Sequence, residues 1–256
     1  MKVYLAAILL LASCSSMNHT QTGFLDRSIT LDRVTYPYTV YVPRDWTPKR
    51  RWPVVLFLHG AGERGNDGRR QMQIGAGAAI RSAPERVPAI VVFPQAPADQ
   101  RWIGRPADAA MMALQQAVRE FHGDNRRLYL TGLSLGGFGT WHLALAHPDT
   151  FAALVPVCGG IVPHGSAASV QQSPLTASAT DPYAFTAERL RHIPIRIFHG
   201  ADDTVVLPSE SQQMYAALRA AGANVEYTEY AGVGHNAWDR AYGDAQLWTW
   251  LFQQRR

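Results

Sequence analysis

The sequence predicts a single α/β domain with a mostly parallel, doubly wound sheet. Its 256 residues are 47% hydrophobic and 17% charged, which suits one globular domain with a sizeable core. Short apolar runs rich in β-branched residues alternate with longer amphipathic segments along the chain, without an internal repeat. Continuous apolar runs are typical of strands buried on both faces, and strands that alternate with helices form parallel sheets.

The apolar runs predict the strands in order. The segments Ile29–Leu31 and Tyr36–Val42 look like the first two, and Pro37 favours an edge position for the second because proline lacks an N–H donor. Buried strands are predicted at Val54–Leu58, Ile90–Phe93, Leu128–Leu130, Ala152–Val157 and Ile193–Phe198, with a last candidate at Asn224–Tyr230.

Helices are predicted between these strands. Asp108 can cap a helix that runs to about Phe121, with Gly123 beyond its end, and Ser209 can cap the segment Glu210–Ala220. Two more helices are expected at Gly136–Ala146 and Asp244–Phe252. A long segment from Ile161 to about Asp181 has no clear periodicity. It follows a strand, so we expect it at the edge of the sheet where ligands bind, shaping specificity.

The first residues have the pattern of an export signal. Lys2 is followed by the apolar run Val3–Leu11, which is shorter than the roughly 20 residues that span a bilayer. Leu11-Ala12-Ser13-Cys14 resembles a bacterial lipoprotein lipobox, which implies cleavage before Cys14 and lipid on its thiol and new amino group. The alternative is an ordinary secretory signal with an incidental cysteine.

We therefore expect three regions: a signal peptide at 1–13, a flexible tether at 14–27 and a catalytic domain at 28–256. The expected location is the bacterial cell envelope, at the outer membrane in a Gram-negative species, with the membrane reached through lipidated Cys14. The other cysteine, Cys158, lies in an apolar stretch and is predicted to be a buried, inert thiol.

Composition argues against several classes of partner. The net charge is +4, but no Lys/Arg run is longer than Lys49-Arg50-Arg51, so we expect a solvated surface and no nucleic-acid partner. No histidine or cysteine cluster has metal-ligand spacing, and no glycine motif fits a dinucleotide or a P-loop. We expect neither a metal nor a cofactor.

The chemistry is indicated by Gly132-Leu133-Ser134-Leu135-Gly136. This G-x-S-x-G pattern lies between a predicted strand and a predicted helix, where glycines allow a sharp turn that exposes the hydroxyl above the sheet. A serine hydroxyl is a poor nucleophile until a base, usually a histidine oriented by a carboxylate, removes its proton. The sequence must therefore supply both partners downstream of Ser134.

Both partners are present in the order serine, acid, histidine. Of nine histidines, His235 alone lies beyond the acidic residues of the next strand end, in a glycine-rich loop after the last strand. The acid should follow Ile193–Phe198, where Asp202 and Asp203 are adjacent. Successive loop residues point in different directions, so only one should face His235, and spacing alone does not choose between them.

An acyl-transfer site also needs two backbone donors for the oxyanion. One should be the N–H of Leu135, and the other should come from the loop after Val54–Leu58, where we choose Ala61. His59, in the same loop, precedes the serine in the chain and is interpreted as structural. Candidate pocket residues are Trp102, Trp238 and Gly62; ordinary packing is the alternative for the two tryptophans.

Four motifs together resemble a bacterial α/β-hydrolase family. They are His-Gly-Ala-Gly-Glu-Arg-Gly, Thr-Gly-Leu-Ser-Leu-Gly-Gly-Phe-Gly-Thr-Trp, His-Gly-Ala-Asp-Asp-Thr-Val-Val and Tyr-Ala-Gly-Val-Gly-His-Asn-Ala-Trp. Members are called predicted peptidases, phospholipase/carboxylesterase-like or dienelactone-hydrolase-like proteins. The resemblance runs from about residue 35 to the C-terminus and implies the α/β-hydrolase fold. Its acid motif, H-G-x-x-D-x-x-V, selects Asp203, and it implies Ser134 as nucleophile and His235 as base.

These observations predict a serine esterase that works through an acyl-enzyme. One alternative is a prolyl-oligopeptidase-like peptidase acting on small peptides, although such enzymes usually add a large gating domain that 256 residues do not accommodate. A second alternative is a non-catalytic surface lipoprotein on a hydrolase scaffold. The expected partner is a small-molecule or polysaccharide-linked ester, and candidates include short acyl esters, acetylated or feruloylated polysaccharide and polyester fragments.

Overall fold

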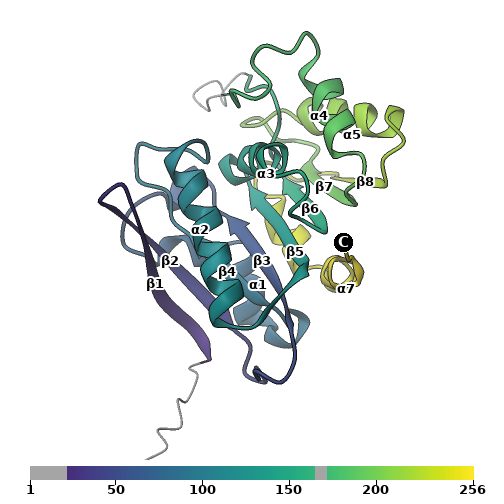
Figure 1. Ribbon diagram of the computed structural model, residues 1–256. Coiled ribbons are helices and arrows are strands. Elements are labelled where there is room, and N and C mark those ends of the chain that lie inside the picture. The colour runs from purple at the N-terminus through teal and green to yellow at the C-terminus, as the bar shows by residue number, and fades with distance from the viewer. Residues whose placement is uncertain (1–21, 165–171) are drawn as a thin grey trace, which may run out of the picture.

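The computed structural model describes residues 22–164 and 172–256. Within them, eight strands form one sheet in the order β1-β2-β4-β3-β5-β6-β7-β8 (Figure 1). Strands β3 to β8 run parallel, and β1 and β2 are antiparallel additions at one side. The strands are β1 Gly23–Leu31, β2 Val34–Val42, β3 Trp52–Leu58, β4 Ile90–Pro94, β5 Gly123–Leu133, β6 Ala153–Val157, β7 Ile195–Gly200 and β8 Val225–Tyr230. The predicted α/β-hydrolase fold is confirmed.

Helices cover both faces of the sheet. The helices are α1 Ala76–Ser82, α2 Arg105–Glu120, α3 Leu135–Ala146, α4 Pro182–Leu190, α5 Ser209–Ala220, α6 Trp238–Gly243 and α7 Ala245–Gln253. Buried residues of α2 to α5 pack in one hydrophobic cluster with the sheet, and those of α1, α6 and α7 pack in a second. The sheet is therefore buried on both faces, which explains its continuous apolar strands. In the described part of the chain, no helix is long and apolar enough to cross a membrane.

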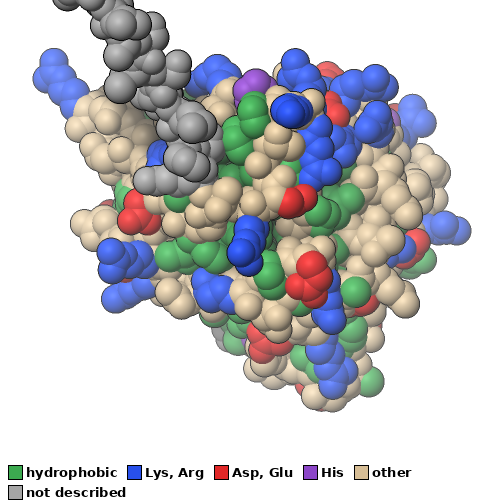
Figure 2. All heavy atoms as spheres, turned by 90° about the horizontal axis from the view of Figure 1, so that it is seen from below, with side chains coloured by type: hydrophobic (Ala, Val, Ile, Leu, Met, Phe, Trp, Pro, Cys, Tyr) green, Lys and Arg blue, Asp and Glu red, His purple; other side chains and the backbone are tan. Residues whose placement is uncertain are grey.

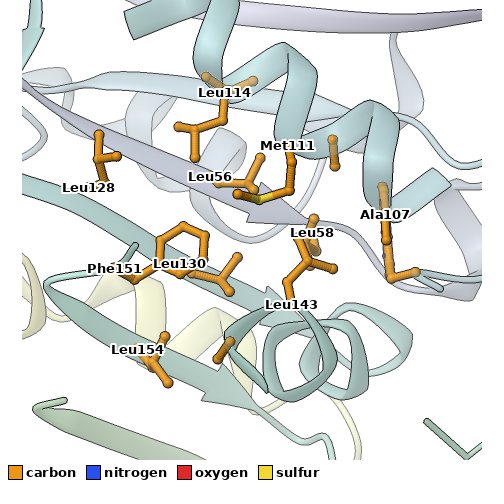
Figure 3. Close-up of a cluster of buried hydrophobic side chains, with 14 of the residues drawn as sticks. Leu56, Leu58, Ala107, Met111, Leu114, Leu128, Leu130, Leu143, Phe151 and Leu154 are labelled. Atoms are coloured by element: carbon orange, nitrogen blue, oxygen red, sulfur yellow. The ribbon is translucent and has the colours of Figure 1, made fainter. Parts of the chain in front are cut away.

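Figure 3 shows the first cluster where α2 and α3 lie on the sheet. The labelled side chains are Leu56, Leu58, Ala107, Met111, Leu114, Leu128, Leu130, Leu143, Phe151 and Leu154, and all are buried. Burial of one such leucine stabilises the fold by roughly 1.5–3 kcal/mol. Helix α3 is buried along most of its length, so the turn that precedes it is anchored by the core.

The ordered domain begins earlier than we predicted from the sequence. Strand β1 starts at Gly23, so the boundary at residue 28 is wrong and the end of the predicted tether belongs to the sheet. Leu25 and Ile29 point to the core, while Arg27 on the same face forms an ion pair of 2.6 Å with Glu120 of α2. Because Arg27 is charged, it interrupts the alternation of apolar and polar residues that would have predicted the start of this strand. The predicted signal peptide, Cys14 and the rest of the tether to residue 21 lie outside the described residues.

The edge position predicted for the second strand is also wrong. Strand β2 lies between β1 and β4. Pro37 is nevertheless accommodated, because the ladder with β4 begins only at Tyr38. On the side of β2 that faces β4, the carbonyl of Pro37 accepts a hydrogen bond from the N–H of Gln95, which lies just beyond the end of β4. The N–H that proline lacks would therefore not have paired with β4.

Two predicted helix caps are displaced, and the side-chain caps of α4 (Asp181) and α7 (Asp244) were missed. Helix α2 starts after Gly104, so Asp108 lies in its first turn, and α5 starts at Ser209 itself. Asp181 caps α4 by accepting hydrogen bonds from two backbone N–H groups of its first turn. The predicted long loop has neither helix nor strand in its described part before α4, and residues 165–171 lie outside the description.

Charges on the surface are mixed in sign. On the face shown in Figure 2, Lys and Arg side chains lie dispersed among acidic and uncharged groups. Several arginines pair with acidic neighbours: Arg50 with Asp45 at 2.8 Å, Arg70 with Asp67 at 3.1 Å and Arg105 with Asp32 at 3.2 Å. Exposed pairs of this kind contribute little to stability, roughly 0–1 kcal/mol each.

The turn from β5 into α3 requires glycine where backbones meet. A Cβ atom on Gly136 would collide with the carbonyl oxygen of Leu58, at the end of β3. A Cβ atom on Gly132 would collide with the carbonyl oxygen of Gly136. Backbone atoms of a core strand cannot move aside cheaply, so α3 begins this close to the sheet only because no side chain intervenes.

Gly136→Ala should lower the free energy of unfolding by about 3 kcal/mol, because overpacking against backbone costs that much. Chemical denaturation followed by circular dichroism measures the change. Gly243→Ala is the matched control, since a Cβ atom there meets nothing within 4 Å. Equal stabilities of the two variants would show that the close approach is not a constraint.

Candidate active site

Ser134 occupies the sharp turn between β5 and α3. Its backbone has φ 53° and ψ −118°, a conformation that costs a non-glycine residue roughly 1–3 kcal/mol. The turn is held by its N–H, which donates to the carbonyl of Val157 on β6 at 3.0 Å, and by its carbonyl, which accepts from Gly137 N–H at 2.8 Å. The strained turn places Ser134 at the carboxyl ends of the parallel strands.

His235 lies in the loop between β8 and α6 and contacts Ser134 directly. Its Nε2 is 2.9 Å from Ser134 Oγ, and its Nδ1 is 2.7 Å from Asp203 Oδ2. A carboxylate can only accept, so Nδ1–H donates to Asp203 and Nε2 is left to accept from the serine hydroxyl. Three residues far apart in sequence thus form one continuous hydrogen-bonded chain.

The structure brings Asp203, and not Asp202, to this histidine. Asp203 is 3% exposed, whereas Asp202 lies at the surface. The second oxygen of Asp203, Oδ1, accepts hydrogen bonds from the N–H groups of Val205 at 2.8 Å and Val206 at 3.0 Å. The choice that spacing left open is therefore made by the turn after β7, which directs one carboxylate inward.

His199 also supports Asp203, and the sequence reasoning missed it. Its ring is fully buried: Nδ1 lies 2.7 Å from Ser211 Oγ, while Nε2 lies 2.9 Å from the carbonyl of Val206 and 3.2 Å from Asp203 Oδ2. Burial by itself raises the pKa of the Asp203 carboxyl, but hydrogen bonds from His199 and His235 outweigh it and hold that pKa well below its usual range. The position of His199, four residues before the acid at the end of a strand, was the available signal.

Both residues chosen as oxyanion donors begin a helical turn. Leu135 is the first residue of α3, and Ala61 is the first residue of a short 3-10 helix, Ala61–Glu63. The first N–H groups of a helix have no partner within it, so both are free of intrahelical bonds. Gly60 brings the loop close to the nucleophile, because a Cβ atom placed on it would lie 3.6 Å from Ser134 Cβ.

The loop of residues 59–65, here called the oxyanion loop, is held from beneath by His59. The ring is fully buried, Nδ1–H donates to the carbonyl of Gly60 at 2.6 Å, and Nε2 accepts from Ala96 N–H at 3.0 Å. Both ring nitrogens are therefore used by backbone groups, as the structural interpretation of His59 requires. Arg64 braces the same loop by donating to the carbonyl of Ala61 at 2.9 Å.

The three predicted pocket residues have different surroundings. Trp102 is 2% exposed, and its Nε1–H donates to the carbonyl of His59 at 3.0 Å. Trp238 packs edge-on against the ring of His235, with 5.3 Å between centroids. Gly62 faces open space, because a Cβ atom there would meet nothing within 4 Å. Of the three, only Trp102 lines the pocket beside α3.

That pocket is a narrow crevice with a volume of about 20 Å³, and it lies beside the start of α3. It is lined by Arg101, Trp102, Ile103, Leu135, Phe138, Gly139, Trp141, His142, Leu145, Gly160, Ile161, Ser173 and Thr176. Leu135 directly follows Ser134, but neither Ser134 nor His235 lines this pocket. Its lining is mostly apolar, as is usual for small-molecule sites.

Cys158 lies beneath the hydrogen-bonded chain. It is fully buried, and burial raises the pKa of its thiol well above the usual value, so the thiol stays protonated at neutral pH. Its sulfur, a carboxylate oxygen of Asp203 and a ring nitrogen of His235 lie within 4.8 Å of one another. Asp203 and His235 form a direct hydrogen bond with each other. The predicted buried thiol is confirmed.

The buried His59 should make stability depend on pH. Burial lowers its pKa to about 4 from 6.5, so the folded state keeps it neutral while the unfolded chain binds a proton. Its contribution is fully present above pH 6.5 and is lost as the pH falls toward 4. Between about pH 7 and pH 5, wild type should lose roughly 2 kcal/mol more stability than His59→Gln. Urea denaturation at both pH values measures this, and equal losses would contradict it.

The chain is similar to two esterases in sequence and to one solved esterase in structure. The chain is 28% identical to carboxylesterase SOBER1 of Arabidopsis thaliana over 57% of this chain and 61% of that one. It is 27% identical to feruloyl esterase B of Thermothelomyces thermophilus over 84% of this chain and 80% of that one. A solved thermostable esterase superimposes with a TM-score of 0.78 at 32% identity, covering 91% of this chain and 63% of that one. The chain thus spans less than two thirds of the first and the third of these proteins.

A family model, described as the prolyl oligopeptidase family, matches residues 97–255. That segment begins just before Trp102 and contains Ser134, Asp203 and His235, so the match covers the hydrogen-bonded chain and four of the eight described strands, β5 to β8. It leaves out the oxyanion loop and the first strands. Because the matched residues make up more than half of the sequence, this protein belongs to the prolyl oligopeptidase family, within the α/β-hydrolase fold.

Proposed function

We propose that this protein is a serine hydrolase that cleaves carboxylic esters. The observation that carries the proposal is the hydrogen-bonded chain from Asp203 through His235 to Ser134 at the carboxyl ends of the parallel strands. This arrangement activates a hydroxyl: the histidine removes the proton, and the carboxylate holds the ring in the required tautomer and stabilises its charged form. The three roles are the nucleophile for Ser134, the base for His235 and the orienting acid for Asp203.

The first half of the reaction forms an acyl-enzyme. Ser134 Oγ attacks the ester carbonyl carbon while its proton moves to His235 Nε2. The carbonyl oxygen becomes an oxyanion that the N–H groups of Leu135 and Ala61 stabilise. The bond to the alcohol oxygen then breaks, and His235 Nε2 gives its proton to that oxygen, so the alcohol leaves neutral.

The second half uses water. A water molecule attacks the acyl carbonyl carbon and gives a proton to His235 Nε2. The bond to Ser134 Oγ breaks, the serine recovers the proton from Nε2, and the carboxylic acid leaves. The low pKa of the Asp203 carboxyl fits its role, because the acid remains ionised beside the imidazolium that forms twice in each cycle.

The relatives favour an ester over a peptide. The three proteins described above are called a carboxylesterase, a feruloyl esterase and a thermostable esterase. The family name points to peptide bonds instead, and the same three side chains can attack an amide. Cleavage of aminoacyl 4-nitroanilides without any ester cleavage would favour the peptidase.

We further propose that the protein is exported and anchored to the cell envelope by lipid on Cys14. The sequence Leu11-Ala12-Ser13-Cys14 after a charged and apolar start supports this. A hydrolase held at the envelope would meet esters outside the cytoplasm, including polysaccharide-linked ones.

Substitutions of Ser134 and Asp203 test the proposed roles of the reacting groups. Ser134→Ala should lower kcat for 4-nitrophenyl acetate on the order of 10⁶-fold, and Asp203→Asn on the order of 10⁴-fold, because the latter leaves His235 in the wrong tautomer. Steady-state kinetics measure both, with circular dichroism to verify folding. Asp202→Asn is the matched control and should keep wild-type activity. Full activity of folded Ser134→Ala would exclude this mechanism.

Substitution of Cys14 tests the proposed lipid anchor. Full-length protein made in a bacterial host supplied with an alkyne-bearing fatty acid should carry the label and partition into detergent. Cys14→Ser should abolish both properties, because it removes the thiol that receives lipid. Cys158→Ala removes the other thiol and should retain the label. Export of unlabelled wild type would point to an ordinary secretory signal.

A further inference from the structure

The chain enters the folded domain at the edge of the sheet opposite Ser134. Strand β1 begins at Gly23, which pairs with Val42 at the end of β2. Tyr41, one residue before Val42, pairs with Val91 near the start of β4. Because β4 is parallel to β3 and β3 to β5, Gly23 lies at the amino ends of the parallel strands, whereas Ser134 lies beyond their carboxyl ends. In Figure 1 the chain joins the sheet at its lower edge.

Basic side chains gather at this edge, on a surface that we call the basic face. It consists of residues 43–51, 84–88, 119–127, 147–150 and 254–256, which precede strands, follow helices or end the chain. These segments hold ten Lys and Arg and five Asp and Glu, an excess of five positive charges. Nine of the ten basic side chains are exposed. Figure 2 is seen from below and looks onto this edge of the molecule.

Contacts between the segments make the basic face one surface. The first segment is bonded to the third, because Arg51 Nη1–H donates to the carbonyl of Gly123 at 3.2 Å. The last is bonded to the third, because Arg256 Nη2–H donates to the carbonyl of Asn125 at 3.1 Å. The second segment shares a surface cleft with the first, and the fourth shares one with the last. Folding therefore assembles a basic surface that no long run of Lys and Arg encodes.

Most of these charges are not neutralised by neighbours. Within the described residues, two of the ten basic groups form ion pairs: Arg50 with Asp45 and Arg127 with Asp124, both at 2.8 Å. A third acid of the face, Glu120, is paired at 2.6 Å with Arg27 of β1, which lies outside the face. The remaining basic groups are thus available to an anionic partner.

The loops around Ser134 have the opposite charge balance. The described residues 59–75, 95–104, 201–210 and 231–240 hold seven Asp and Glu against five Lys and Arg. The folded domain therefore has a basic end, where the chain enters, and a mildly acidic end, where the hydrogen-bonded chain of the active site lies. A negatively charged surface attracts the first end and repels the second.

We infer that the basic face docks on a bilayer surface that contains anionic phospholipid and holds Ser134 toward the aqueous side. Each Lys or Arg near such a surface strengthens binding about fivefold at low salt. The proposed lipid on Cys14 would bring this face to the bilayer, because the nine residues from 14 to 22 span at most roughly 30 Å. The charge of the face does not depend on that lipid. In this orientation, esters reach Ser134 from the aqueous side.

Binding to vesicles without the lipid anchor tests the docking. Residues 14–256 contain every strand, helix and core side chain described above, so the mature chain can be made without its signal and with Cys14→Ser to exclude lipid. In flotation at about 50 mM salt, it should bind phosphatidylcholine vesicles with about 30% phosphatidylglycerol but not phosphatidylcholine alone, and about 300 mM salt should release it.

Neutral substitutions show which end of the domain binds. Arg44, Lys49 and Arg119 are exposed and form no ion pair with a described residue. Arg44→Gln, Lys49→Gln and Arg119→Gln together should weaken binding on the order of 100-fold, about fivefold for each charge. The matched control, Arg33→Gln, Arg69→Gln and Arg240→Gln, removes the same net charge from exposed residues at the other edge and should bind like the unsubstituted chain. Circular dichroism verifies that both variants fold.

Three outcomes would overturn the docking: equal weakening in the two triple variants, equal binding to neutral vesicles, or tighter binding to a DNA duplex than to the anionic vesicles. Turnover of 4-nitrophenyl acetate should be the same for the free and the vesicle-bound chain, and its loss on binding would overturn the orientation. A folded chain that docks as expected but has no turnover in either state would contradict only the proposed ester hydrolysis.

Discussion

The site depends on how closely the start of α3 approaches the ends of its neighbouring strands. Gly136 lies against the carbonyl of Leu58, and Gly137 lies against Gly159 after β6, with no space for a side chain at either contact. These two contacts bring the loops after β3 and β6 to opposite sides of Ser134. Any larger residue would push the helix away, and Ser134 would separate from His235, with which it forms a hydrogen bond. The primary constraint is therefore steric.

A second requirement is electrostatic: the buried carboxylate of Asp203 needs hydrogen-bond donors, and most of them come from the turn in which it lies. A buried carboxylate costs several kcal/mol unless donors replace its water. Asp203 has four: two N–H groups from its own turn and two imidazole rings, His199 and His235. Because these donors are in place before any substrate arrives, His235 is oriented without rearrangement when charge develops on it. The turn after β7 thus holds the Asp203 carboxylate, and that carboxylate orients the ring of His235.

Sequence reasoning succeeded where the information is local. Ser134 and His235 could be placed because a strand–turn–helix pattern and chain order suffice to position them. Asp202 and Asp203 could not be separated by spacing, since adjacent residues differ only in the direction they face. The position of His199 four residues before Asp203 was a signal in the sequence, but its contacts with Ser211 and the Val206 carbonyl form only in the folded turn.

Other features were missed because they contradict the binary pattern of polar and apolar residues. Glu210 is a charged residue in the first turn of a helix, where it would ordinarily face water, yet it is 1% exposed and holds the loop after β6. Arg27 interrupts the inward row of β1 in the same way. Such residues are recognisable only after the partners that satisfy them are known, and here the partners lie 27 or more positions away in the chain.

Trp102 connects the crevice beside α3 with the oxyanion loop. Trp102 lines the pocket beside α3, and the same indole donates to the carbonyl of His59, which holds the oxyanion loop from beneath. The ring of His59 packs on that indole with 4.8 Å between centroids. Substitutions at Trp102 must therefore disturb the oxyanion loop, because they remove the hydrogen bond to the carbonyl of His59 and the ring contact with its imidazole.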